Sequence, residues 1–204
     1  MSQPQTKTHF DLSGGNLALN FTNTVSDRPT PHAREKLYDY NRLVFFGIDS
    51  GVLTHADRLF ALAGESPGRG KNALQKATQF REALYDIFSA VVEHRAVPGN
   101  SLTFLNVMLL EAAEHGRLIY RDRRFVWEWM HMDSYLDSLL WPIARAAADL
   151  LMSDEIHNVR LCAAQDCGWL FVDRTKNRRR RWCDMKVCGN RVKARRHYQR
   201  AKAN

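Results

Sequence analysis

The first 161 residues of this 204-residue chain contain no cysteine, so all four cysteines fall between residues 162 and 188. Four unrelated buried thiols would not gather in this way, and the clustering indicates a shared role. The chain also lacks any stretch near the ~20 apolar residues of a membrane-spanning helix. Its first sixteen residues contain no apolar run typical of a signal peptide. We therefore expect a cytoplasmic protein that does not enter a membrane.

Motifs of the common enzyme classes are absent as well. The sequence contains no glycine-rich phosphate loop, no nucleophile elbow and no paired-carboxylate motif. Glu111 and His115 stand four residues apart on a predicted helix, but two metal ligands without a third are typical of a surface pair. We therefore expect a protein that is not an enzyme.

The cysteines form two pairs, Cys162 with Cys167 and Cys183 with Cys188, with fifteen residues between the pairs. Four thiolates complete the tetrahedral shell of one structural Zn²⁺ ion, and such a closed site leaves no position for a catalytic water. Disulfides are the alternative, and they would need an oxidising compartment. A metal ion would also stabilise a charged segment of about forty residues that is too small to fold by apolar burial alone.

Charge is distributed unevenly along the chain. Residues 160–204 contain fourteen Lys and Arg against three acidic residues, a net charge of +11. Residues 1–159 contain sixteen against nineteen, a net charge of −3, and the two parts together give +8. A nearly neutral body with a strongly basic end is typical of proteins that bind a polyanion, and we favour this over a tail that only aids solubility.

The residues Cys188-Gly189-Asn190-Arg191 resemble the CGNR zinc finger, a bacterial module. Upstream, GGNLALNFTNTVSDRP at 14–29 and FREAL at 80–84 resemble the ABATE domain, which usually precedes this finger. Together the two resemblances cover nearly the whole chain. They imply a proposed stress-induced transcription regulator of bacteria, in which a zinc-bearing, DNA-binding end follows a domain of unproven role.

Hydrophobic periodicity predicts a mainly helical N-terminal domain with one small β-hairpin, hence an α+β fold. We expect helices over residues 17–25, 37–48, 56–62, 72–95, 101–115 and 134–152. Asn16, Thr54 and Ser101 are the expected N-caps of the first, third and fifth of these helices. Residues 64–70 are expected to form a flexible connection.

Between the last two helices the hydrophobic period changes. Residues 117–120 and 125–129 are aromatic and branched around the polar turn 121–124, which predicts the β-hairpin. Pro142 predicts either a kink in the last helix or a helix start near Trp141.

A short polar connection at 153–158 ends this part of the chain. We therefore expect an ABATE-like domain over 1–155, with a frayed segment 1–8, and a semi-rigidly placed zinc finger over 156–204. The finger is expected to be treble-clef-like, with a strand at 168–173, a turn at 174–177, a returning strand at 179–182 and a C-terminal helix at 189–202. Its aromatic residues are expected to form a miniature core, with base stacking as the alternative: Trp169, Phe171 and Trp182.

Basic and amide side chains of the finger are the expected nucleic-acid contacts, some on the hairpin and some around the helix. They are Lys176, Arg178, Arg179, Arg180, Arg181, Asn190, Arg191, Lys193, Arg195, Arg196, Gln199 and Arg200. Base reading would fall to Arg191, Arg195, Asn190 or Gln199, although Asn190 has the alternative role of holding the knuckle turn. Duplex DNA is the expected partner, and RNA or an acidic protein is the alternative.

Polar side chains on otherwise apolar segments form a candidate ligand pocket in the N-terminal domain: Asn16, Asn20, Asn23, Arg28 and Arg81. Helix capping and hydrogen bonds between helices are the ordinary alternative. A pocket would imply a small-molecule effector. The chain is also compatible with a homodimer, about which its sequence gives no direct signal.

Overall fold

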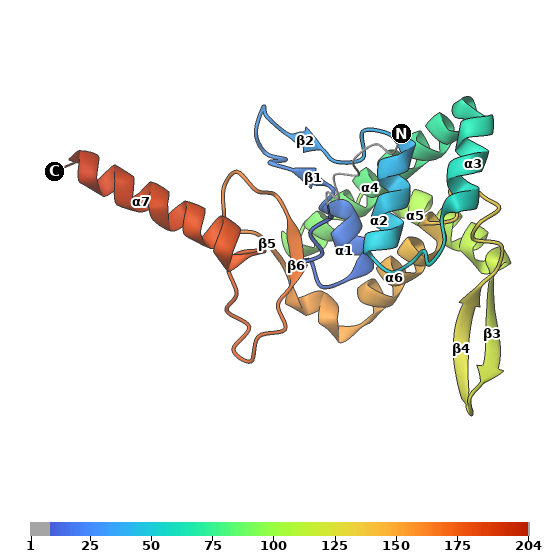
Figure 1. Cartoon of the computed structure of the whole chain (residues 1–204). Coiled ribbons are helices and arrows are strands. Elements are labelled where there is room, and N and C mark those ends of the chain that lie inside the picture. Colours follow the sequence, from blue (N-terminus) through green and yellow to red (C-terminus); the bar gives the residue numbers. More distant parts are fainter. Residues whose placement is uncertain (1–8, 204) are drawn as a thin grey trace.

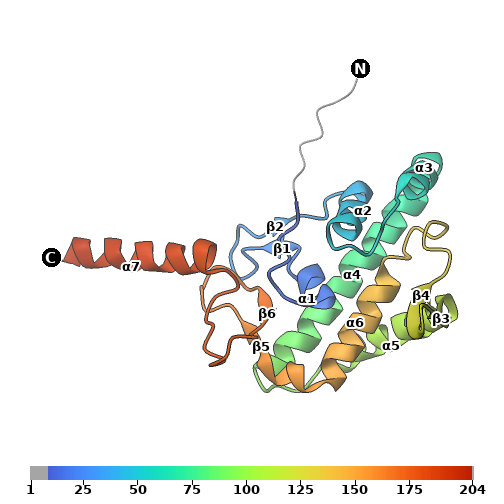
Figure 2. The ribbon, with the colours of Figure 1, turned by 60° about the horizontal axis from the view of Figure 1, so that its bottom comes forward.

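The computed structural model describes residues 9–203, so the predicted frayed segment 1–8 lies outside it. Six helices of the described part form a body, from which α7 projects at one end and a two-stranded ribbon at the other (Figure 1). Figure 2 shows the length of α7 from a second side. The body contains α1 (Leu17–Thr22), α2 (Tyr40–Asp49), α3 (Asp57–Glu65), α4 (Pro67–Val92), α5 (Gly99–His115), α6 (Leu140–Met152), the short pair β1 (Val25–Ser26) and β2 (Arg34–Glu35), and the ribbon strands β3 (Gly116–Arg121) and β4 (Arg124–Trp129).

The C-terminal part is connected to the body by a single short segment, η1 (Asp154–Asn158). It contains β5 (Val159–Leu161), β6 (Leu170–Val172), η2 (Met185–Gly189) and α7 (Asn190–Ala203). The architecture is therefore the predicted one, a mostly helical domain with small hairpins followed by a small finger with a terminal helix. None of the helices described here is long and apolar enough to cross a membrane.

The predicted helical period of α4 builds the centre of the core. Ala77, Phe80, Leu84 and Ile87 recur at three- and four-residue spacing, and all four are buried. The N-cap of α1 is also as predicted, because the Asn16 carboxamide oxygen accepts a hydrogen bond from the Ala18 N–H at 2.8 Å.

Three local predictions are wrong. Residues 64–70 do not form a flexible connection, because α4 already begins at Pro67, where the fixed φ of proline suits the first helical turn. Thr54 does not cap α3, whose N-cap is Ala56 without a side-chain bond. Ser101 lies inside α5 rather than before it, and its hydroxyl bonds to Asp86 Oδ2 at 3.3 Å on the neighbouring helix.

The hairpin and the start of α6 follow the sequence. Strands β3 and β4 pair antiparallel around Asp122 and Arg123, whose φ values of 51° and 60° are those of a tight two-residue turn that twists with the strands. Helix α6 begins at Leu140, so Pro142 falls in the first turn, where its missing N–H removes no helical bond. A helix start near Trp141 was one of the two predicted outcomes.

The hairpin of the finger is formed by a different pair of strands from the predicted pair. Strand β6 pairs with β5, which precedes the first cysteine, and residues 179–182 form no strand. Among the backbone hydrogen bonds of residues 9–203, one joins that segment to the first knuckle, from the Ala163 N–H to the Arg181 carbonyl at 2.8 Å. Strand β6 is drawn toward β5 because Val159, Leu170 and Val172 complete the hydrophobic core of the body. The finger and the body therefore share a core.

Candidate metal centre and nucleic-acid interface

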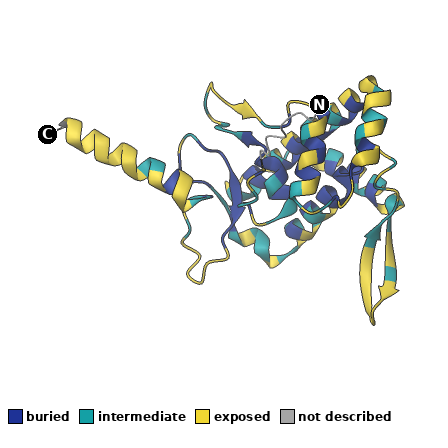
Figure 3. Ribbon diagram, in the orientation of Figure 1, coloured by how far each residue is buried: buried dark blue, intermediate teal, exposed yellow. Residues whose placement is uncertain are grey.

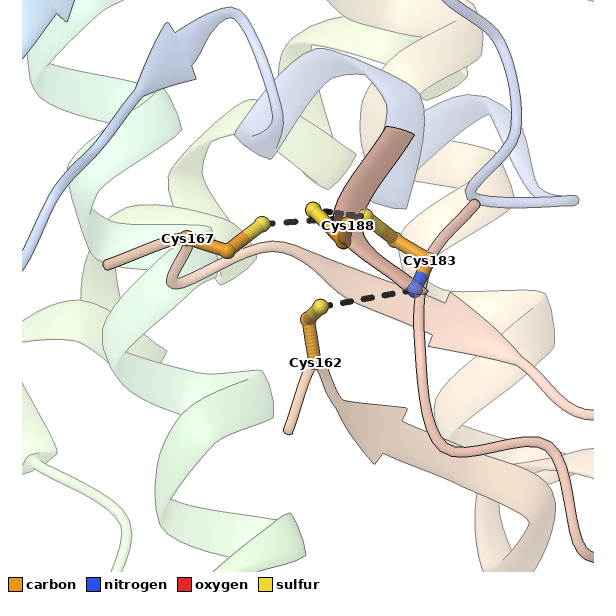
Figure 4. Close-up of side chains that lie close together, drawn as sticks. All are labelled: Cys162, Cys167, Cys183 and Cys188. Atoms are coloured by element: carbon orange, nitrogen blue, oxygen red, sulfur yellow. Dashed lines mark hydrogen bonds between the residues drawn. The ribbon is translucent and has the colours of Figure 1, made fainter. Parts of the chain in front are cut away.

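The four cysteine sulfurs point toward one another at the junction of β5, β6 and α7 (Figure 4). All four lie within 4.8 Å of one another, and Cys183 Sγ is 3.6 Å from both Cys167 Sγ and Cys188 Sγ. A Zn²⁺ ion with four thiolates at ~2.3 Å separates its sulfurs by about 3.8 Å. The thiols are buried and free of disulfides. Their arrangement is therefore that of one tetrahedral metal site.

The chemistry of the cluster also suits a bound cation. Hydrogen bonds from Cys167 and Cys183 lower the pKa of the Cys162 thiol, whereas burial raises the pKa of the Cys188 thiol. Four adjacent thiolates away from water would repel one another, so the thiols lose their protons together only to a metal ion. We therefore assign the cluster as a closed, structural zinc site.

Aromatic side chains shield this site, as predicted. Trp169 and Phe171 are buried beside the cysteines, and Trp182 and Val192 pack against the same cluster. The Trp169 indole N–H donates to the Val25 carbonyl of the body at 2.8 Å. The burial of Trp169 and Phe171 argues against the alternative role of base stacking for these two rings.

Comparison with family models covers both parts of the chain. The model ABATE, described as a putative stress-induced transcription regulator, matches residues 15–154. The chain belongs to the ABATE family. The CGNR zinc finger model matches residues 158–201, so both resemblances inferred from the sequence are confirmed. A search of the curated proteins finds no match to this ABATE protein.

The first two turns of α7 are fastened to the zinc knuckle. Arg191 Nη2 lies 3.1 Å from Asp166 Oδ1 and 3.5 Å from Cys188 Sγ, and Arg195 Nη2 lies 2.9 Å from Asp166 Oδ2. Arg191 Nη1 also lies 3.7 Å from Asp27 in the ABATE domain. Although burial opposes ionisation, the arginines lower the pKa of Asp166. Two residues expected to read bases thus hold the helix in place.

The opposite face of α7 is free. The following expected contacts are exposed and make no ion pair or side-chain hydrogen bond within the described residues: Lys193, Arg196, Gln199 and Arg200. Lys193, Arg196 and Arg200 share one face, turned away from the face that carries Arg191 and Arg195. Asn190 is exposed at the start of α7, and with residues 9–203 its side chain forms no hydrogen bond that would hold the knuckle turn.

The basic loop before the second knuckle is organised by Asp173. Its carboxylate accepts bonds from the Thr175 N–H at 2.9 Å and the Arg180 N–H at 2.8 Å. The Arg180 guanidinium turns inward, donates to the Trp182 and Cys183 carbonyls and lies 4.5 Å from the Phe171 ring. Arg180 is therefore a structural residue. The other basic side chains of this loop are exposed: Lys176, Arg178, Arg179 and Arg181.

The five predicted pocket residues do not line one pocket. Asn16 caps α1, Asn20 has a buried Oδ1 atom with no hydrogen-bond partner in the described chain, and Asn23 binds the backbone of β6. Of the five, Arg28 and Arg81 line a common cavity, of about 600 Å³.

Acidic partners dominate that cavity, and the sequence analysis missed them. Arg81 makes two bonds with Glu35, of 2.6 and 2.7 Å, and Arg28 donates to Glu82 at 2.5 Å. Glu35 and Arg81 are 46 residues apart and Arg28 and Glu82 are 54 apart, so the sequence held no direct signal for either pair. The sequence also gave no indication that Asp166 and Asp27 form ion pairs with Arg191.

The ABATE domain contacts the finger through the β1–β2 loop. Gly168 lies at φ +73°, and a Cβ atom there would come within 2.9 Å of Arg28 Cβ and 3.0 Å of Pro29 Cδ. The Lys36 ammonium lies 4.4 Å from the centre of the Trp169 ring. Glycine is therefore required at the point where the first knuckle meets the loop.

Proposed function

We propose that this ABATE protein binds duplex DNA through exposed side chains of α7 and of the basic loop before the second knuckle, and that it regulates transcription. The observation that supports this most is the position of α7, which stands clear of the body and is exposed along most of its length (Figures 1 and 3). An α-helix with side chains is about 10–12 Å wide and fits the major groove, which is about 12 Å wide. The finger end carries the +11 charge that attracts phosphates.

The proposed interface divides its work between two groups of residues. Eight exposed basic side chains would contact phosphates and fix the orientation of the duplex: Lys176, Arg178, Arg179, Arg181, Lys193, Arg196, Arg200 and Lys202. Gln199 is exposed, lies between this free face and the face of Arg195, and would read a base, as glutamine does with adenine. Arg191 and Arg195 would position the helix instead. The zinc ion would have a structural role and no catalytic one.

Selection of bound sequences from a random duplex library, followed by titration against salt, tests the proposal. We expect one enriched motif and a slope of log K against log[salt] near −7 if all eight residues contact phosphates. Gln199→Ala should change the motif more than the affinity, whereas Arg200→Ala should weaken all sequences alike. Lys71→Ala, an exposed cation on α4, is the control and should change neither. Binding of every polyanion without a motif would contradict sequence-specific regulation and support a general RNA or acidic-protein dock.

We also propose that the cavity lined by Arg28 and Arg81 takes a small effector. The same β1–β2 loop borders this cavity and touches Gly168, so a bound molecule would act on the finger through that loop. A thermal-shift screen of the full chain against metabolites tests this. A hit that stabilises the wild type but not Arg81→Met supports the site, and absence of any hit across a broad panel contradicts it.

A further inference from the structure

The ribbon of β3 and β4 has one aromatic face. Its register places Leu118 opposite Trp127 and Tyr120 opposite Phe125, so these four side chains share a face. They are exposed by 62%, 40%, 65% and 71% respectively. The ribbon stands away from the helices, and most of its length is exposed (Figure 3). A large aromatic surface is therefore presented to solvent.

The other face of the ribbon suits water. Arg117 and Arg121 both form ion pairs with Glu128, at 2.5 and 3.1 Å, and these charged side chains keep this face of the ribbon polar. The ribbon is also held firmly at its base, where the Trp127 ring packs against the backbone of Gly116 and lies 5.0 Å from the Arg145 guanidinium on α6. The aromatic face is thus fixed in place and left uncovered.

The outer face of α5, which runs directly into β3, is apolar and uncharged. Residues 99–110 contain no charged side chain, and Val107 and Leu110 are 49% and 69% exposed. We call these two residues and the four aromatic-face residues the α5–ribbon patch. With about 150–250 Å² for each fully exposed aromatic side chain, the patch amounts to roughly 600–700 Å². A stable interface buries about 800 Å² on each partner, so the two surfaces together come close to the area that a dimer needs.

Charges of opposite sign, unpaired within residues 9–203, flank the ribbon face and the α5 face. Arg123 and Arg124 at the ribbon tip, and Glu114 on α5, are exposed and make no ion pair within the described residues. The ribbon carries its tip away from α5, so these charges do not meet in one molecule (Figure 1). Residues 97–135 hold four arginines against five acidic residues, a net charge of −1, which neither repels a second copy nor attracts a polyanion.

From this area and charge pattern we propose that the α5–ribbon patch is the interface of a homodimer. A two-fold pairing needs only one self-complementary surface. The aromatic face of each ribbon covers the uncharged face of the other copy's α5, and the arginine tip of each ribbon reaches Glu114 of the other copy. The patch lies at the opposite end of the molecule from α7, so both DNA-binding helices stay free.

Analytical ultracentrifugation of the full zinc-loaded chain tests the interface. Protein concentrations of about 1 to 100 µM cover the range in which a dimer with a micromolar Kd dissociates. We expect a concentration-dependent dimer in the wild type. Phe125→Glu and, on a separate element, Leu110→Glu should each weaken association at least about tenfold, with unchanged far-UV circular dichroism and melting temperature. Met152→Glu, an equally exposed side chain outside the patch, is the control and should associate like the wild type.

A charge exchange sharpens the test. Glu114→Arg should weaken the dimer, and combining it with Arg123→Glu and Arg124→Glu should restore association. A chain that stays monomeric throughout the range overturns the proposal, and so does a dimer that neither patch variant weakens. A monomer whose DNA affinity falls in Phe125→Glu would likewise overturn it, because the ribbon would then be a nucleic-acid contact.

Discussion

The side-chain amide of Asn23 binds the backbone of Leu170, 147 residues further along the chain. Its Nδ2 donates to the Leu170 carbonyl at 2.8 Å, and its Oδ1 accepts from the Leu170 N–H at 3.0 Å. Both groups are buried. The ABATE domain thereby supplies a pair of hydrogen bonds to the free edge of β6, as a neighbouring strand would. This contact fixes the finger on the body.

We expect Asn23→Ala to lower the free energy of unfolding by about 2–4 kcal/mol, because it leaves two buried peptide groups without partners. Urea unfolding of the zinc-loaded protein measures this. Asn72→Ala, on the exposed side of α4, is the matched control and should have little effect. A loss no larger than that of the control would show that the Asn23 contact is dispensable.

Removal of zinc should destabilise the whole molecule and not only the finger. Leu170 and Val172 belong to the core of the body, so loosening the knuckle disturbs that core as well. A chelator should therefore lower the melting temperature of a single transition by at least about 5 °C. Cys188→Ser should behave like the chelated wild type. Two separate transitions, with the first alone sensitive to the chelator, would contradict this coupling.

Arg191 and Lys193 lie two residues apart on α7, but their substitution by alanine should affect different properties of the protein. Arg191→Ala removes the contacts to Asp166, Asp27 and Cys188, so we expect a melting temperature lower by about 2–4 °C and faster zinc loss to a chelator. Lys193→Ala should leave stability unchanged and make the salt slope of DNA binding less negative by about 0.9. The reverse pattern would place Arg191 at the DNA instead.

The Arg28–Glu82 pair should make stability depend on pH. Burial opposes ionisation of Glu82, but hydrogen bonds and charge from Arg28 and Arg81 outweigh it and lower its pKa below 4.5. A carboxyl with a lowered pKa stabilises the fold above its unfolded pKa, and this contribution is lost as the pH falls through the folded pKa. We therefore expect the wild type to lose more stability than Glu82→Gln as the pH falls below 4.5. Zinc loss affects both proteins, so parallel pH curves would exclude a contribution from Glu82.

Local features of this protein follow directly from its sequence. The zinc ligands could be predicted because each cysteine pair lies within six residues, and a short loop leaves few ways to place two thiolates. The helices around Phe80 and Ile143 could be predicted because their apolar periodicity records which side is buried. The ribbon could be predicted from a change of that period.

Contacts between distant segments were decided only by the tertiary structure. The basic character of α7 is plain from its sequence, but the helix face that turns toward solvent depends on Asp166, which lies in the first knuckle. The partner of β6 depended on where Val159 could complete a core formed by other helices. Contacts of this kind join residues that are far apart in the sequence, so no local pattern of residues predicts them.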